Sequence, residues 1–340
     1  MTKLDRIRTW WEERLPALLA EYDVPGAAVA MDLGGEVADH GAGVLNLSTG
    51  VEVDADTLFQ IGSVTKVWTA TLVMQLVDEG LVELDAPVRS RLPEFRIADE
   101  SAASVITVRQ PLSHTAGFEG DIFTDTGKDD DCVEKYVATL NDVPQLFPPG
   151  HLFSYNNAGY CVLGRLVEVV RGKPFGAWLR DHLFTPLGLT HAAHGADEAI
   201  LHRAAVGHLP PSPGEPLQPA PVWSIAPSNS PAGSLLAMRP RDLLAFARMH
   251  LNDGTAGNGT VVLSEATAKA MREREAELPR LGVMGDAWGL GWEIFDGGST
   301  GLIGQDGTTI GQSAFLRLVP EHDLVVVLLT NGGNTLGLYR

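Results

Sequence analysis

The alternation of apolar and polar residues predicts β-strands at both ends of the chain. Residues 26–33 are a run of small and apolar residues, the pair Gly34-Gly35 favours a tight turn, and residues 36–45 return as the second arm of a hairpin. Toward the other end, further strands are predicted at residues 291–296, 313–320 and 324–330. A hairpin from the start and strands from the end can pair into one antiparallel sheet.

The middle of the chain has a helical pattern instead. Residues 67–77 are mostly apolar and carry no charge, which indicates a buried helix, and residues 158–170 predict a second strong helix. Residues 1–21 predict a further, amphipathic helix. Its apolar positions are Trp10, Trp11, Leu15 and Leu18. Loops rich in proline and glycine, such as residues 208–221, interrupt the helical stretch.

The start of the buried helix carries candidate chemistry, the motif Ser63-Val64-Thr65-Lys66. A serine is a weak nucleophile until a base takes its proton, and a lysine three residues along a helix lies on the same face. Burial lowers the proton affinity of a lysine, which a lysine base requires. The positive end of the helix dipole also favours a developing anion at Ser63. This spacing arises by chance too, so the motif alone leaves a structural interpretation open.

A second candidate is Tyr155-Asn156-Asn157, between a turn-rich loop and the predicted helix at 158–170. A tyrosine at such a junction can point into a cleft and move protons between a serine and a leaving group. Asn157 can offer both a donor and an acceptor to a substrate amide. The alternative is a tyrosine that only packs against the helix.

These two motifs, in this order, resemble the serine β-lactamase and penicillin-binding-protein superfamily, and most closely its class C β-lactamase and esterase-like branch. Other family-like segments follow in the family order: PLSHTAGF (111–118), FTPLGL (184–189), PAGS (231–234) with RDL (241–243), and WGLGW (288–292). The similarity covers roughly residues 24–335, nearly the whole chain.

The resemblance implies an α+β fold of the β-lactamase/transpeptidase type, an antiparallel sheet flanked by helices with an inserted helical lobe. Residues 1–340 then form a single domain, with an α/β lobe from 1–60 and 235–340 and a helical lobe from 61–234. The active site is expected in the cleft between the lobes. Many relatives continue after the last core strand with a small β-barrel or a long helix. The sequence shows neither the barrel nor the long helix. A natural short form and a shortened chain would both have this appearance.

The resemblance also implies an acyl-enzyme on Ser63. Lys66 is then the base for acylation, and Tyr155 relays a proton to the leaving group and back from the acceptor. Asn157 becomes a substrate holder and a partner of Lys66.

The third family motif is where this chain departs from its relatives, which have Lys-Thr-Gly or His-x-Gly on the strand beside the nucleophile. Here the sequence reads Gln305-Asp306-Gly307-Thr308. Gly307 keeps room for a substrate along the strand, and the amide of Thr308 should form the oxyanion hole together with that of the nucleophile. Gln305 can hydrogen-bond Tyr155 or the substrate, but it has no charge. Two interpretations of Gln305 are open. It is either a neutral stand-in that preserves the geometry or a residue that weakens the activity.

Composition and charge narrow the class of partner. The net charge of −18 argues against nucleic acid or an anionic membrane as a partner. With 340 residues, 44% of them hydrophobic, the chain can bury a large core. Neither a signal peptide nor a run of 18 apolar residues is seen, so a cytoplasmic location is expected. The two cysteines, Cys132 and Cys161, fit a reduced compartment rather than a disulfide scaffold.

The histidines do not predict a metal site. His191 and His194 have no carboxylate or cysteine at ligand spacing, so neither a metal nor another cofactor is expected. His114 is interpreted as a structural hydrogen-bonding residue at a helix start rather than a base. The sequence has no G-x-S-x-G elbow, which excludes an α/β-hydrolase.

The sequence therefore predicts a serine hydrolase or acyltransferase whose partner is a small-molecule or peptide-like acyl substrate: an ester, an amide or a thioester. β-Lactam turnover is the least favoured activity, because it depends on a cationic third motif. One alternative is a thioesterase or peptide cyclase that releases a biosynthetic peptide from a carrier protein, for which Arg239, Arg241 and Arg248 are the candidate basic patch. Another is a weakened or non-catalytic relative that binds peptide-like ligands, which Gln305 favours and the two intact motifs oppose.

Overall fold

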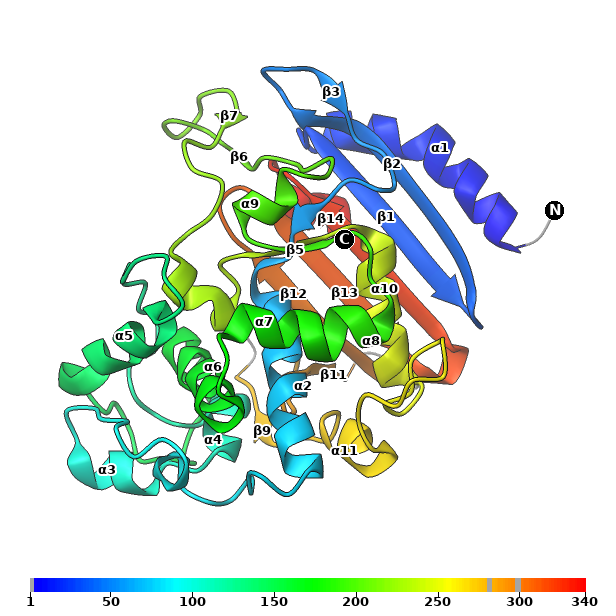
Figure 1. Cartoon of the computed structure of the whole chain (residues 1–340). Coiled ribbons are helices and arrows are strands. Elements are labelled where there is room, and N and C mark those ends of the chain that lie inside the picture. Colours follow the sequence, from blue (N-terminus) through cyan, green and yellow to red (C-terminus); the bar gives the residue numbers. More distant parts are fainter. Residues whose placement is uncertain (1–2, 280–282, 297–300) are drawn as a thin grey trace.

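A nine-stranded antiparallel sheet forms the centre of the protein (Figure 1). The computed structural model describes residues 3–279, 283–296 and 301–340. The strand order is β3-β2-β1-β14-β13-β12-β11-β10-β9. The strands are β1 (Gly26–Leu33), β2 (Glu36–Asn46), β3 (Val51–Glu52), β9 (Ala276–Glu277), β10 (Ala287–Trp288), β11 (Glu293–Phe295), β12 (Leu302–Thr308), β13 (Ser313–Val319) and β14 (Leu324–Thr330).

The two ends of the sequence meet in this sheet. β1 pairs with β2 on one side and with β14 on the other, so Ala27 lies opposite both Ala42 and Thr330. The expected hairpin, the last strand and the α+β fold are thereby confirmed. The strand expected at 291–296 is shorter, because Gly291 has a φ of 97° and does not continue an extended chain.

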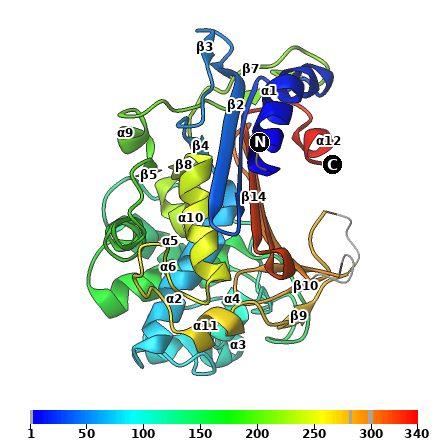
Figure 2. The ribbon, with the colours of Figure 1, turned by 90° about the vertical axis from the view of Figure 1, so that its right-hand side faces the viewer.

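Helices cover both faces of the sheet (Figure 2). On one face lie α1 (Lys3–Glu21) and the short α12 (Thr335–Tyr339), whose Tyr339 ring stacks on Phe315 of β13. On the other face lie α2 (Thr65–Asp78) and α10 (Pro240–Leu251). The sheet is therefore the middle layer of three.

The N-terminal helix buries a stripe that includes Trp11 and Leu15, as its sequence suggests, but not Trp10 or Leu18. Trp10 is 52% exposed and Leu18 is only half-buried. The buried positions are Leu4, Trp11, Leu15 and Leu19. Positions three to four residues apart, or seven apart, lie on one side of a helix, and this side packs against apolar residues of β1 and β2.

The buried helix that the sequence predicts is α2. Its residues from Thr65 to Leu76 are all buried. Trp68 stacks on Phe246 of α10, with ring centroids 3.8 Å apart and planes 11° from parallel. Packing from every side thus holds the helix that carries the Ser-x-x-Lys motif.

The stretch between β4 (Phe59–Gln60) and β8 (Leu236–Met238) is mainly helical. Its helices are α3 (Glu100–Val105), α4 (Arg109–Leu112), α5 (Cys132–Ala138), α6 (Asn157–Arg171), α7 (Phe175–Leu179), α8 (Thr185–Leu187) and α9 (Ala196–Ala199). It also contains β5 (Ala192–His194), which the helical pattern did not predict, and the two-residue pair β6 (His208–Leu209) and β7 (Gln218–Pro219). β8 pairs with both β4 and β5, so the two ends of the stretch are joined by a small sheet.

One continuous buried core joins the sheet to these helices. It contains Ala28 and Leu329 from the sheet, Val67 from α2 and Leu163 from α6. Across residues 3–279, 283–296 and 301–340, no helix combines the length and the apolarity needed to cross a membrane.

The three arginines of the candidate basic patch are all ion-paired. Arg239 pairs with Asp56 and Asp242, and Arg241 with Asp39. Arg248 on α10 pairs with Asp32 of β1 and with Asp323, which precedes β14. Arg248 and Asp32 are both buried, so their pair ties α10 to the sheet beneath it.

Removing Arg248 should therefore destabilise the protein. Arg248→Ala leaves Asp32 buried without its partner, and we expect the free energy of unfolding to fall by about 3–5 kcal/mol. Urea denaturation followed by circular dichroism measures this. The control is Arg241→Ala, which breaks a pair whose arginine is 52% exposed and should cost about 1 kcal/mol or less. Equal losses in the two variants would contradict the proposed role of the buried pair.

Candidate active site

Ser63 and Lys66 lie side by side where a 3₁₀ turn, η1 (Gly62–Val64), runs into α2. The sequence predicts a single α-helix here, but Ser63 belongs to the 3₁₀ turn. Residues three apart eclipse one another in 3₁₀ geometry, so the spacing still brings the two side chains together. Lys66 Nζ lies 3.1 Å from Ser63 Oγ, within hydrogen-bonding distance.

Lys66 is fully buried at the bottom of this site. Its Nζ donates a second hydrogen bond to the carbonyl oxygen of Ala232, at 2.7 Å. It also lies 4.8 Å from the centre of the Tyr155 ring and 5.7 Å from that of Tyr160. Apart from Ser63, its neighbours are thus aromatic faces and a backbone carbonyl rather than water.

This burial decides the protonation of Lys66. Desolvation lowers the pKa of Lys66 to about 7, against opposing interactions with Cys161 and Asp121. Burial also raises the pKa of the Cys161 thiol to about 12, so Asp121 is the formal negative charge that acts on the lysine. A lysine with a pKa near 7 can act as a base at neutral pH.

Tyr155 lies next to this pair, at the last position before the cap of α6. Burial raises the pKa of Tyr155 above its usual range, while its contact with the Ser63 hydroxyl acts in the opposite direction. The phenol is therefore protonated at neutral pH and can donate a proton near Ser63. The structure thus brings together Ser63, Lys66 and Tyr155.

His114 holds the junction that presents Tyr155. Its Nδ1 accepts a hydrogen bond from the backbone N–H of Asn156 at 2.9 Å, and Asn156 caps α6 by accepting from the N–H of Gly159. The His114 ring packs 4.5 Å from the Tyr155 ring and 4.6 Å from that of Trp288. Desolvation and the nearby Lys66 hold its pKa well below the usual value. His114 follows the end of α4 rather than starting a helix, and it supports the start of α6.

Asn157 lines the cleft beside Ser63, as a substrate holder would. The expected partnership with Lys66 is not what the structure shows. Asn157 Nδ2 donates to the carboxylate of Asp121 at 3.2 Å, while Lys66 Nζ bonds Ser63 and Ala232. The reason is tertiary, since residues 118–121 run alongside the start of α6.

Two glycines bring the β12 backbone against the nucleophile. Gly62 has a φ of 51°, and a Cβ on it would lie 2.8 Å from the backbone nitrogen of Thr308. A Cβ on Gly307 would lie 2.0 Å from the carbonyl oxygen of Ile61 and 2.8 Å from the backbone nitrogen of Ser63. The space that Gly307 was expected to keep for a substrate is therefore occupied by the backbone that carries the nucleophile.

Gln305 is completely buried beneath the nucleophile. Its Nε2 lies 3.4 Å from the carbonyl oxygen of Ser63, and its Oε1 has no hydrogen-bond partner among the described residues. The side chain is not among those that line the cleft. Its neighbour Asp306 projects to the opposite face of the strand, where it forms a two-bond ion pair with Arg317.

The cleft over Ser63 has a volume of about 290 Å³ and a mixed lining. Its apolar side chains are Phe123, Ile225, Ala232 and Ile310. Its polar ones, besides Ser63, are Asn157, Asn229, Ser234, Thr308 and Thr309. No lysine or arginine contributes to this lining among the described residues.

Sequence reasoning missed two parts of the site. One is Ala232, the last residue of η5 (Pro227–Ala232), whose carbonyl accepts the second hydrogen bond of the lysine. The PAGS segment was recognised there, but a backbone acceptor leaves no signature in residue type. The other is Asp121, whose contact with Asn157 depends on how two loops pack.

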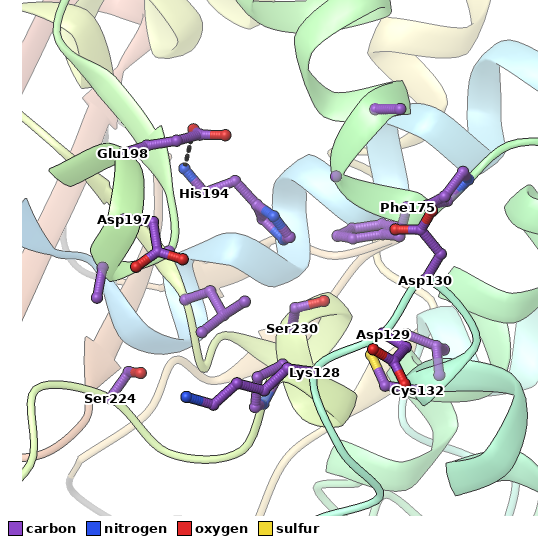
Figure 3. Close-up of a pocket in the computed structure, with 18 of the residues that line it drawn as sticks. Lys128, Asp129, Asp130, Cys132, Phe175, His194, Asp197, Glu198, Ser224 and Ser230 are labelled. Atoms are coloured by element: carbon purple, nitrogen blue, oxygen red, sulfur yellow. Dashed lines mark hydrogen bonds between the residues drawn. The ribbon is translucent and has the colours of Figure 1, made fainter.

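A second cavity, of about 330 Å³, has Ser230 of η5 in its lining (Figure 3). His194, Asp197 and Glu198 line one side of it, across from Asp129 and Asp130. The backbone N–H of His194 donates to Glu198, and desolvation lowers the His194 pKa to about 4. No set of three or more metal-ligating side chains is found in the described part of the chain.

The close approach at Gly307 generates a prediction. Gly307→Ala should push β12 away from Ser63 and lower the rate of Ser63 acylation by about two to three orders of magnitude, the usual effect of losing an oxyanion donor. Burst kinetics with a p-nitrophenyl ester measure this rate, and circular dichroism checks the fold. Gly257→Ala is the matched control, because a Cβ there meets nothing within 4 Å. A Gly307→Ala rate within threefold of the unaltered protein would contradict the geometry described here.

Known proteins resemble this chain over nearly its whole length. The chain is 46% identical to penicillin-binding protein 4 of Amycolatopsis lactamdurans over 95% of its own length and 85% of that protein. Among solved structures it is similar to SurE, with 32% identity, a TM-score of 0.82 and coverage of 99% of this chain and 73% of the other. A D-amino acid amidase from Ochrobactrum anthropi, solved with D-phenylalanine, matches at 25% identity and a TM-score of 0.76, covering 94% of this chain and 91% of the other.

More distant relatives and a family model were also matched to the chain. The chain spans about 61% of the length of several more distant curated relatives, at 24% identity. The model of the β-lactamase family matches residues 11–339, from the first helix to the last. The chain therefore belongs to the β-lactamase family of serine hydrolases.

Proposed function

We propose that this protein is an acyl-transfer enzyme that forms an ester between its substrate's acyl group and Ser63 Oγ. The observation that carries the proposal is the desolvated lysine at 3.1 Å from that oxygen, with a pKa of about 7. A structural lysine in such a position would be ion-paired. Lys66 instead faces a hydroxyl, a carbonyl and two aromatic rings.

The side chains support a two-step reaction. Lys66 takes the Ser63 proton as Oγ attacks the substrate carbonyl carbon, and the bond to the leaving group then breaks. Tyr155 donates its phenolic proton to the leaving group and recovers one from Lys66. Water or an amine then attacks the acyl-enzyme, with the same groups acting in reverse and Ser63 restored.

The carbonyl oxygen needs donors as negative charge develops on it. We assign this role to the backbone N–H groups of Ser63 and Thr308, which Gly62 and Gly307 allow to approach each other. Such donors contribute a few kcal/mol each when they are already in place before the reaction.

The cleft favours an apolar acyl group. Phe123, Ile225 and Ile310 surround the space above Ser63, and no cation lines it in the described residues to pair with a substrate carboxylate. SurE was solved with D-Leu at 31% identity, and the amidase, which is named for D-amino acids, was solved with D-phenylalanine and also with L-phenylalanine. We therefore propose an ester, amide or thioester of an apolar D-amino acid residue as the substrate class.

Two other substrates have less support. β-Lactam turnover would call for a cation at the third motif, where Gln305 is buried and neutral. An acidic carrier protein would need a basic patch, but Arg239, Arg241 and Arg248 are each engaged by carboxylates. A small acyl substrate fits the charges better than a carrier-bound one.

The nucleophile can be tested by covalent labelling. A fluorophosphonate should add once to the intact protein, and peptide mapping should place the adduct on Ser63. Ser63→Ala should lose both the adduct and the turnover of p-nitrophenyl esters while its unfolding curve stays unchanged. Turnover within tenfold of the unaltered protein in Ser63→Ala, or an adduct elsewhere, would point to a non-catalytic binding protein or to another nucleophile.

The lysine base predicts a particular pH dependence. Only the neutral amine can accept the Ser63 proton, so acylation should rise about tenfold per pH unit below the lysine pKa of about 7 and level off above it. Lys66→Ala should be slower by about two to four orders of magnitude. Lys66→Arg should not restore the rate, because arginine stays protonated. Stopped-flow acylation between pH 5 and 9 measures the pH profile and the rates of both variants. An active Lys66→Arg variant would rule out Lys66 as the base.

A further inference from the structure

We propose that Asp121 is a positioning residue that fixes the amide of Asn157, so that the cleft selects acyl groups carrying an N–H next to the reacting carbonyl. The proposal rests on the function proposed above, since it names what the same site selects. Asp121 belongs to no motif of the sequence, and its role follows from contacts between two loops.

The loop that carries Asp121 is attached to the start of α6. The backbone N–H of Ala158 donates to the carbonyl of Gly120 at 3.0 Å, and Asn156 Nδ2 donates to the carbonyl of Phe118 at 2.8 Å. A Cβ on Gly120 would lie 2.3 Å from Asn156 Oδ1, so only glycine permits this approach. These contacts fix where the carboxylate of Asp121 lies relative to Asn157.

The carboxylate in turn orients the asparagine. Asn157 Nδ2 donates to Asp121 Oδ1 at 3.2 Å. The flipped amide would place Asn157 Oδ1 against a negative charge, which is unfavourable. The favoured rotamer thus directs Nδ2 toward Asp121 and leaves Oδ1 on the other side as an acceptor.

That acceptor belongs to a residue of the cleft. Asn157 lines the same space as Ser63 and is almost fully buried, so a hydrogen bond made there is shielded from water. A peptide-like acyl group carries an N–H on the carbon next to its carbonyl. Such a group gives Oδ1 a donor, and an acyl group without that N–H leaves Oδ1 without a partner.

Asp121 also acts on the base through its charge. The side chains that face Lys66 are Ser63, Tyr155, Tyr160, Cys161 and His114, and none of them carries a negative charge at neutral pH. The Asp121 carboxylate opposes the desolvation that lowers the lysine pKa. Removing this charge should lower the lysine pKa further and move the acid limb of acylation to lower pH.

Paired substrates test the orientation. The probes are the p-nitrophenyl esters of N-acetyl-D-leucine and of N-acetyl-N-methyl-D-leucine, which differ in the N–H. The unaltered protein should prefer the first in kcat/KM by about threefold to tenfold, the usual effect of one hydrogen bond. Asp121→Ala should lose this preference, and Asp121→Asn should keep most of it, because its side-chain oxygen can still accept from Asn157. Both variants should shift the acid limb to lower pH.

The control is Asp125→Ala, which removes a carboxylate from the same loop. Asp125 is exposed, as Asp121 is, but it accepts only from the nearby N–H of Gly127 among the bonds found in the described residues and not from Asn157, so preference and pH profile should stay unchanged. An unchanged preference in Asp121→Ala would overturn the proposal, as would an equal loss in Asp125→Ala.

A binding measurement separates this proposal from the reaction itself. In the Ser63→Ala background, calorimetry with the two matching D-leucine amides should show the same preference for the N–H form and the same loss in Asp121→Ala. If the unaltered protein forms no Ser63 adduct, the proposed function fails, and the calorimetry still decides the role of Asp121. If the adduct forms but neither readout responds to Asp121→Ala, the role of Asp121 alone is refuted.

Discussion

The removal of Lys66 from water is the interaction on which the site depends. In water its ammonium would hold its proton far above neutral pH. In α2 it contacts two tyrosine rings and the carbonyl of Ala232, and desolvation lowers its pKa to about 7. Nearly all of α2 is buried, and Trp68 stacks on Phe246 to fix one side of it. The hydrophobic core therefore bears directly on the proposed reaction, because the packing that buries the apolar side chains of α2 also removes Lys66 from water and lowers its pKa.

The sheet brings backbone amide groups close to Ser63, which α2 by itself does not. The proposed reaction needs amide donors at a fixed place, and we assign these to the junction between η1 and β12. Gly62 and Gly307 let two backbones meet at a distance that any side chain would prevent. Gln305 fills the space beneath this junction and bonds the Ser63 carbonyl, so in this protein the third motif supports the backbone of the nucleophile.

The start of α6 is the third organising element. Asn156 caps the helix, His114 bonds the cap, and the loop of Asp121 is attached to the same turn. Tyr155 and Asn157 flank the cap, so the same turn positions the proposed proton relay and the proposed substrate holder. Both are therefore set by a helix cap, a structure that sequence can locate, and by a loop contact that it cannot.

The sequence by itself determined the local features of this protein. The Ser63–Lys66 spacing, the junction at Tyr155, the hairpin and the last strand all follow from periodicity and neighbouring residues, which act over a few positions. The tertiary structure decided the rest. Asn157 pairs with Asp121 rather than Lys66, Gly307 makes room for backbone rather than substrate, and Trp10 faces outward. Each of these depends on which distant segment packs alongside, and a pattern along the chain carries no information on which backbone or charge will occupy the space next to a side chain.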